Sequence, residues 1–363
     1  MKIEASWMII LTLVLTGVFG PAALGAQPRI LIEKIPSNLP YGLQEQIQKL
    51  YSPSAVDRGY AAVGLGSLGT AAAPALPFLK SMLGDGIDLR KIVPQAQGNK
   101  TAPGLHATGD TSPGREAALA MAQMGLAGVK ELISALQGAD GAAAAGAAYG
   151  LGQAKTILAV APLEALLRNG TAGAARAEAA SALGNIADLH ALNPLASALK
   201  DRESVVRSNA AEALGRLGDR RAVAGLIALL RDDEMRVRES AMLALAKIKD
   251  PLAVEPLIAR LKAPFDDSTA AFALGEIKDR RAVKALLGTL VRTSSYTAQA
   301  AAAEALGKIN DLSAIEPLIR ILEIEKDELL RGAAAKALKA LTSFDYGANG
   351  ARWRAWWNAG RNK

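Results

Sequence analysis

The stretch Ser204–Asp232, SVVRSNAAEALGRLGDRRAVAGLIALLRD, decides how this chain folds, because related segments recur before and after it. Its apolar residues recur at spacings of three and four, first at Val206, Ala210, Ala213, Leu214 and Leu217 and then at Val223, Leu226, Ile227 and Leu230. Such spacings place apolar side chains on one face of an α-helix. Between the two runs, Gly218 breaks the pattern and Asp219 stands where a helix N-cap is expected. The stretch therefore predicts a hairpin of two amphipathic helices.

This hairpin recurs with a period of about 31 residues. The glycine of its Ala-Leu-Gly motif, or the residue that replaces it, falls at Gly66, Ala122, Gly152, Gly184, Gly215, Ala246, Gly275, Gly307 and Lys339. The first interval is much longer than the others because it contains an insertion. A single hairpin of this kind cannot bury its apolar face alone, so neighbouring hairpins must stack. The sequence therefore predicts an all-α fold, an α-solenoid of about nine helical hairpins.

Two charged columns share the register of the motif. The arginines are Arg58, Arg176, Arg207, Arg238 and Arg331, and the aspartates are Asp188, Asp219, Asp250, Asp279 and Asp311. With them, the consensus V-R-x-x-A-A-x-A-L-G-x-[IL]-x-D-x-x-A-[VI]-x-x-L resembles the HEAT repeat in its bacterial, phycobilisome-lyase-type form, over residues 54–341. The resemblance implies that both columns form a polar ladder between neighbouring hairpins. Charges that recur in every unit fit stacking better than unique chemistry, so we interpret these residues as scaffold.

The N-terminus predicts export. Residues 1–26 contain Lys2, an apolar run from Trp7 to Phe19 and then small residues, which is the pattern of a secretory signal peptide cleaved after Gly25 or Ala26. The alternative is an uncleaved anchor, although a run of about 13 residues is shorter than the roughly 20 that a membrane span needs. We therefore expect an exported protein, in the periplasm or outside a bacterium. The absence of cysteine rules out disulfides and a lipid-anchored cysteine.

The remaining chain divides by composition. Residues 27–53 are predicted to form an extended lead-in and a half-repeat cap. Residues 54–341 are predicted to form the solenoid. The inserted loop at 84–114 is rich in Gly, Pro, Thr and Asn, and it is either a disordered excursion or a functional segment. The run Gly138–Gly152 is nearly all Ala and Gly, so its hairpin is expected to be the loosest.

Residues 342–363 carry a tryptophan cluster. Trp353, Trp356 and Trp357 lie at i, i+3 and i+4, on one face of a short helix. The segment is predicted to be a C-terminal cap, and it is similar to a W-x-x-W-W ending of some exported bacterial HEAT-repeat proteins. The alternative is an aromatic surface that stacks on a sugar or sits in a membrane interface.

No catalytic constellation stands out. Only His106 and His190 are present, and neither is followed by Glu. The His-Glu pairs that hold iron in deoxyhypusine hydroxylase, which is built from similar repeats, are therefore absent. There is also no P-loop and no G-x-S-x-G motif. The sequence predicts a protein that is not an enzyme and that uses no metal or cofactor. The alternative is a HEAT-like enzyme, or a lyase-type chromophore-handling protein, that uses the 84–114 loop.

The predicted function is an exported scaffold or adaptor that binds another macromolecule, expected to be a protein and not nucleic acid, on the concave face of the solenoid. A net charge of +7 permits an acidic partner. Second helices carry a row of cations near their C-termini, at Arg168, Lys200, Arg231 and Lys262, with Arg292 and Arg320 nearby and an interruption at Glu323. Either these cations only stabilise helix ends, or they form a stripe that selects an acidic partner. Membrane contact is expected only through an uncleaved signal segment, and the oligomeric state stays open.

Overall fold

The computed structural model describes residues 30–87, 112–138, 140–263, 265–293 and 295–361. Every regular element in this part of the chain is an α-helix or a 3-10 helix, and the predicted all-α solenoid is confirmed. None of the described helices is long and apolar enough to span a bilayer. The predicted signal peptide and most of the predicted insertion lie outside the described residues.

The chain divides into two compact units, Met1–Ala182 and Leu183–Lys363. The boundary falls inside α9 (Gly173–Ile186). Unit 1 contains η1 (Ile32–Lys34), α2 (Tyr41–Lys49), α3 (Ala55–Ser67), η2 (Gly69–Ala75), α4 (Leu76–Ser81), α5 (Pro113–Gln123), α6 (Gly125–Ala135), α7 (Gly141–Ala154), η4 (Ile157–Ala159) and α8 (Val160–Asn169). The first helices α3, α5 and α7 pack side by side, and the second helices α4 and α6 pack on each other.

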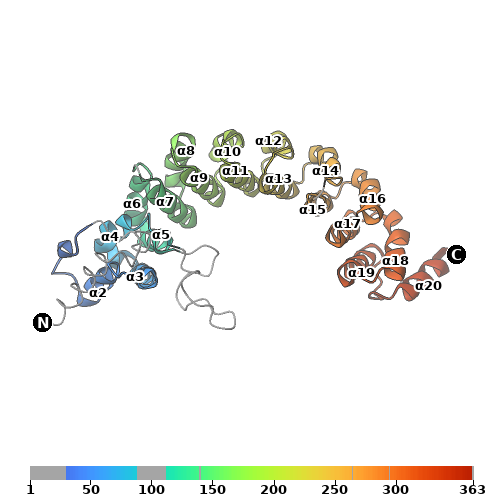
Figure 1. The fold of residues 1–363 in the computed structure, drawn as a ribbon, viewed down its shortest axis with the longest axis horizontal. Coiled ribbons are helices and arrows are strands. Elements are labelled where there is room, and N and C mark those ends of the chain that lie inside the picture. Colours follow the sequence, from blue (N-terminus) through green and yellow to red (C-terminus); the bar gives the residue numbers. More distant parts are fainter. Residues whose placement is uncertain (1–29, 88–111, 139, 264, 294, 362–363) are drawn as a thin grey trace, which may run out of the picture. The chain divides into compact units, whose positions relative to one another are not determined.

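Within unit 2, first and second helices are arranged in the same way (Figure 1). It contains η5 (Leu189–Ala191), α10 (Leu192–Ala198), α11 (Ser204–Leu217), η6 (Arg220–Ala222), α12 (Val223–Leu229), α13 (Met235–Ile248), η7 (Pro251–Ala253), α14 (Val254–Arg260), α15 (Asp267–Ile277), η8 (Arg280–Ala282), α16 (Val283–Arg292), α17 (Tyr296–Ile309), η9 (Leu312–Ala314), α18 (Ile315–Ile324), α19 (Glu328–Thr342) and α20 (Gly350–Arg361). The odd-numbered first helices α11 to α19 form one layer, and each even-numbered second helix from α10 to α18 packs against the first helix that follows it.

The motif glycine explains how closely the first helices approach. A Cβ atom added at Gly215 of α11 would lie 2.8 Å from the Cα of Ala244 in α13. The same distance separates an added Cβ at Gly275 from the Cα of Ala305 in α17. Real Cβ atoms do not come this near to a backbone carbon, so a side chain would force neighbouring hairpins apart. The Ala-Leu-Gly motif is therefore a packing requirement of the stack.

The turn inside each hairpin uses two local devices. The first helix ends at a residue with positive φ, which is Gly218 at 68° after α11 but Ala187 at 60° after α9. This left-handed C-cap satisfies the last helical carbonyls. The aspartate that follows caps the 3-10 turn, as Asp219 does by accepting from the Arg221 backbone N–H at 2.9 Å. The Gly-Asp break predicted from the sequence is thus a C-cap followed directly by an N-cap.

Both ends of the repeat region carry extra helices. At the N-terminal end α2 packs on α3 and buries Leu43 and Ile47. At the C-terminal end α20 packs on α18. Trp353 of α20 is fully buried, and its Nε1 donates to the Gly347 carbonyl at 2.8 Å. The aromatic rings around it include Tyr346 and the half-buried Trp356, so the segment predicted to cap the stack packs as one aromatic cluster.

The predicted insertion at 84–114 leaves and rejoins the fold at one point. The Gly114 N–H donates to the Asp85 carbonyl at 2.9 Å, so its two ends lie side by side. Helix α5 begins at Pro113, which is inside the insertion predicted for residues 84–114. Ser112 caps this helix by accepting from the Arg115 backbone N–H, which explains the earlier start.

Candidate functional site

The arginine column joins each hairpin to its neighbours. Arg207 Nη1 donates to the carbonyls of Asp201 and Arg202, at 2.8 and 3.2 Å, just after α10. Its Nε and Nη2 donate to the Asp232 carboxylate, at 2.7 and 2.9 Å, in the loop after α12. The hydrogen bonds to the Asp232 carboxylate are the main cause of the raised pKa of Arg207. One guanidinium therefore fastens two successive inter-hairpin loops to the start of a first helix.

The other arginines of the column occupy the same kind of position. Arg238 donates to Asp266 at 2.9 Å and Arg176 to the Gly170 carbonyl at 2.8 Å. Arg331 donates to the carbonyls of Leu322, Glu325 and Ala348, at 2.6, 3.0 and 2.6 Å. The remaining one, Arg58 in unit 1, is fully buried and donates to Asp85 at 2.8 Å. Burial raises the pKa of the Asp85 carboxyl, although Arg58 opposes this shift.

The aspartate column does not meet the arginine column, contrary to the single ladder expected from the sequence. Asp219 accepts from Arg221, whose side-chain and backbone hydrogen bonds lower the pKa of Asp219 to about 2. The other four, at Asp188, Asp250, Asp279 and Asp311, likewise cap the 3-10 turns. The reason is distance, since Arg207 lies in the first turn of α11 and Asp219 follows its end, about 18 Å further along. The two columns form separate ladders at opposite ends of the hairpins.

The second ladder also links neighbouring hairpins. Arg220 Nε donates to Asp250 of the next hairpin at 2.6 Å, and Arg280 Nε lies 3.5 Å from Asp311 of the next. These arginines are the first residues of their 3-10 turns and were not singled out in the sequence. The sequence feature that could have identified them is the Arg-Arg pair at 220–221, which recurs two hairpins later at 280–281.

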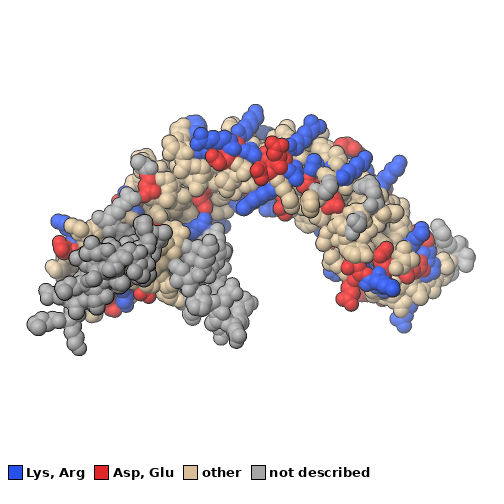
Figure 2. All heavy atoms as spheres, viewed as in Figure 1, with Lys and Arg blue, Asp and Glu red and all other residues tan. Residues whose placement is uncertain are grey.

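The predicted cation row keeps its charges free within unit 2. Lys200, Arg231 and Lys262 follow the second helices of three successive hairpins and are exposed. Among the described residues, none of the three side chains forms an ion pair. Figure 2 shows Lys and Arg side chains, with acidic ones between them, along α10 to α16. The row therefore contrasts with the ladder arginines, whose donors are used inside the fold.

The other members of the predicted row differ from these three. Arg320 is exposed in α18 and lies near Glu323, whose pKa is lowered mainly by hydrogen bonds from Arg354 and also by the charge of Arg320. Arg168 is exposed at the end of α8 in unit 1. Arg292 belongs to α16, but its side chain is outside the described part of the structure.

Large apolar side chains share this edge of unit 2 with the cations, and sequence reasoning missed them. Met235, Phe265 and Tyr296 lie at or just before the starts of three successive first helices and are 48%, 78% and 49% exposed. Met235 and Phe265 line a groove of about 580 Å³, whose far side is formed by Ser295 and Thr297. The sequence feature that could have revealed this groove is the short interval between Ala246 and Gly275, because it shows that one repeat has fewer residues than its neighbours.

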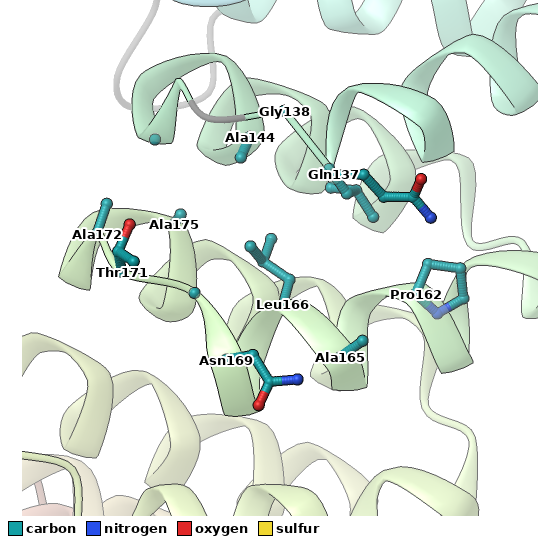
Figure 3. Close-up of a pocket in the computed structure, with 13 residues that line it drawn as sticks. Gln137, Gly138, Ala144, Pro162, Ala165, Leu166, Asn169, Thr171, Ala172 and Ala175 are labelled. Atoms are coloured by element: carbon teal, nitrogen blue, oxygen red, sulfur yellow. The ribbon is translucent and has the colours of Figure 1, made fainter.

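A second hollow lies in unit 1 and has a simpler cause. It measures about 340 Å³ and is lined by small residues of α7, α8 and the start of α9, together with Gln137 and Asn169 (Figure 3). Ala144, Ala165 and Ala175 face this space, and such short side chains leave it unfilled. This is the hairpin region that the Ala- and Gly-rich composition predicted to be loosely packed.

The groove of unit 2 is lined by Lys262, Asp267 and hydroxyl side chains, and the polar side chains of the hollow in unit 1 are those of Gln137, Asn169 and Thr171. Within the described ranges, no group of three or more His, Asp or Glu side chains could hold a metal ion. His190 is exposed, and its Nδ1 lies 2.7 Å from the Asp188 carboxylate as part of the capped turn after α9. His106 falls in the part of the predicted insertion that lies outside the described residues.

Comparison with known families identifies the repeats. The model of the HEAT repeats family matches residues 192–269 and 266–339, and that of the PBS lyase HEAT-like repeat matches residues 175–201. Residues 175–339 of this chain are HEAT repeats. These matches cover the hairpins from α9 to α19, where the HEAT motif, the close glycine contacts and both charged ladders occur together. No curated protein sequence matches the chain.

Three solved structures are similar to this chain at low sequence identity. The E. coli protein YibA is 20% identical, over 62% of this chain and 87% of its own, with a TM-score of 0.50. The complex of CpcE and CpcF of phycocyanin lyase from Nostoc sp. PCC7120 is 21% identical, over 74% of this chain and 97% of that chain, with a TM-score of 0.40. Human deoxyhypusine hydroxylase is 20% identical, over 77% and 100%, with a TM-score of 0.32. Likeness at this level concerns the fold alone.

Proposed function

We propose that this protein is a non-enzymatic scaffold that binds another protein. Stacked helical repeats present extended surfaces, and proteins of this architecture use them for binding. The observation that carries the proposal is the contrast between two sets of cations. The ladder arginines hold hairpins together, whereas Lys200, Arg231 and Lys262 form no ion pair among the described residues. Lys262 also lines a groove together with the exposed side chains of Met235 and Phe265.

The binding surface has two candidate locations within unit 2. One is the layer of first helices, where Leu243 and Phe272 are partly exposed, and which lies on the inner side of unit 2 taken alone (Figure 1). A partner there would match the concave face predicted from the sequence. The other is the edge that carries the cation row. Charge at that edge favours an acidic partner, because opposite charges speed association and fix orientation.

The site of action is proposed from the sequence. Residues 1–26 have the pattern of a signal peptide, so the scaffold would act in the periplasm or outside the cell. Mass determination of the protein purified from its own host tests this proposal. An N-terminus at Gln27, or at Ala26, supports export, and an intact Met1 in the cytosolic fraction contradicts it.

Affinity capture tests the scaffold proposal. The full chain, tagged at its C-terminus, is expressed in its own host and purified from the cell envelope fraction. We expect a co-purifying protein whose capture is lost on charge reversal at Arg231 and Lys262, or on Leu243→Glu with Phe272→Glu if the first-helix layer is the site. Absence of any stoichiometric protein, together with a bound metal or an absorbing chromophore, would favour an enzyme or lyase-type protein instead.

A further inference from the structure

The hairpin of α15 and α16 in unit 2 departs from its neighbours at its start. Helices α11, α13 and α17 each contain 14 residues, whereas α15 contains 11. The shortening is at the N-terminus, because all four helices end in the same register beside a left-handed C-cap. About one helical turn is therefore missing between the first turns of α13 and α17.

The missing turn leaves the groove of about 580 Å³. Its lining comes from three successive hairpins, with Met235 at the start of α13 on one side and Thr297 at the start of α17 on the other. Buried Leu261 also lines it. A repeat that matched its neighbours would fill this space with the first turn of α15. The groove is thus a consequence of one irregular repeat, not of loose packing along the array.

Phe265 lines this groove, and both its exposure and its backbone conformation are unusual for a phenylalanine. Its side chain is 78% exposed, and its backbone has φ of 68°, a conformation that residues with a Cβ seldom adopt. The next residue is fixed, since Asp266 is buried and accepts from Arg238 at 2.9 Å and from Arg260. The fold therefore holds a strained loop in place and presents an aromatic ring to solvent. Strain of this kind points to a binding role more than to stability.

The groove is lined by two charged side chains, Asp267 and Lys262. Both oxygens of Asp267 accept hydrogen bonds, from the Ser268 backbone N–H at 2.9 Å and from Thr293 Oγ1 at 3.4 Å. Lys262, which also lines the groove, is exposed and forms no ion pair among the described residues. The neutral donors on Asp267 do not cancel its negative charge. A carboxylate of a ligand would therefore pair with Lys262, and a second carboxylate would be repelled by Asp267.

We propose that this groove binds an extended segment of a partner protein in which a large apolar side chain stands next to a single carboxylate. The apolar side chain packs between Met235 and Phe265, and the carboxylate pairs with Lys262. Exposed Asp233 and Glu234 lie on the neighbouring loop, so a segment that is acidic along its whole length is disfavoured. The inference rests on the scaffold function and names the segment that the scaffold recognises.

Selection from a random peptide library tests the recognition directly. The protein as purified from its own host is immobilised, and displayed 12-residue peptides are selected in parallel on the wild type and on Lys262→Glu. We expect the wild type to enrich peptides with Asp or Glu beside Phe, Trp, Leu or Met, and the variant to lose that acidic preference. No enrichment, enrichment of uniformly acidic peptides, or the same motif on both proteins would overturn the proposal.

Affinity measurements on one enriched peptide then assign the contacts. By fluorescence anisotropy, we expect Lys262→Glu and Phe265→Ala each to weaken binding at least tenfold, and Lys262→Glu to flatten the dependence of affinity on salt. Lys200→Glu is the matched control, because Lys200 follows α10 as Lys262 follows α14 but does not line the groove. Equal loss in Lys200→Glu would show general attraction to charge and would contradict a specific site.

One substitution separates a binding residue from a structural one. Phe265→Gly removes the ring and relieves the positive φ, so we expect a higher melting temperature together with loss of peptide binding. A variant that melts lower and keeps its affinity would refute the assignment of Phe265.

Failure of the groove proposal can be told apart from failure of the scaffold function. A co-purifying protein that is captured equally by the wild type, Lys262→Glu and Phe265→Ala would leave the scaffold function standing and remove the groove. The absence of any captured protein would remove the scaffold function itself. Binding of the wild type to vesicles of anionic lipid, with no selected peptide, would assign the edge to a membrane surface and overturn the peptide proposal.

Discussion

Substitution of the motif glycine in α11 tests whether close helix contact specifies this stack. In Gly215→Ala, the new Cβ would lie 2.8 Å from the Cα and 2.9 Å from the Cβ of Ala244. Neither atom is the end of a flexible side chain, so the backbones of α11 and α13 must separate. Overpacking of this kind costs about 1–3 kcal/mol. The better helix propensity of alanine offsets up to about 1 kcal/mol of this cost, so we expect the free energy of unfolding to fall by about 1–2 kcal/mol.

A second glycine in the same unit provides the matched control. Gly332 lies inside α19, and a Cβ added there meets no atom within 4 Å. Gly332→Ala should therefore stabilise the protein by about 0.5–1 kcal/mol through helix propensity alone. Urea unfolding followed by circular dichroism at 222 nm measures both changes, and hydrogen exchange shows whether the loss in Gly215→Ala is concentrated in α11 and α13. If Gly215→Ala proved as stabilising as Gly332→Ala, close approach would not be what the motif requires.

The turns, the first ladder and the acid response give three further tests. Ala187→Gly should stabilise the protein by about 0.5–1 kcal/mol, because Ala187 has φ of 60°, and Gly218→Ala at the equivalent turn should destabilise it by about 1 kcal/mol. Melting temperatures that rank the two variants the other way would contradict the C-cap assignment. Arg207→Ala should lower the free energy of unfolding by about 1–3 kcal/mol, because it removes partly buried charged hydrogen bonds, and it should leave partner binding intact below the melting temperature. Lost binding with an unchanged melting temperature would make Arg207 part of the binding site. Stability should fall as the pH drops from about 4 to about 2, because the folded-state pKa of Asp219 is lowered to about 2 and the pKa values of four other aspartates, Asp188, Asp250, Asp279 and Asp311, are also lowered. The stability that these carboxylates contribute is complete above the unfolded-state pKa of about 3.9 and is lost as the pH falls below it. Urea midpoints that stay constant over this range would refute this prediction.

Much of the architecture could be predicted from the sequence because it is local and periodic. Apolar spacing marks the helices, and the Gly-Asp break marks a turn that Gly218 and Asp219 cap within a few residues. The motif glycine recurs because each hairpin meets the next in the same way. A contact that is made many times leaves a periodic pattern in the chain, so the stack of hairpins is evident from the order of the amino acids alone.

The partners of the charged residues depended on the tertiary structure. Arg207 and Asp219 share one repeat, yet the length of α11 separates them, and Arg207 instead meets Asp232 from the following loop. The binding groove is still less visible in the sequence, because it arises where α15 lacks a turn that its neighbours have. Sequence periodicity determined what the repeats have in common. Only packing in three dimensions decided which side chains pair across hairpins and where a missing turn exposes Phe265 and Lys262, since both depend on residues that stacking brings together from different repeats.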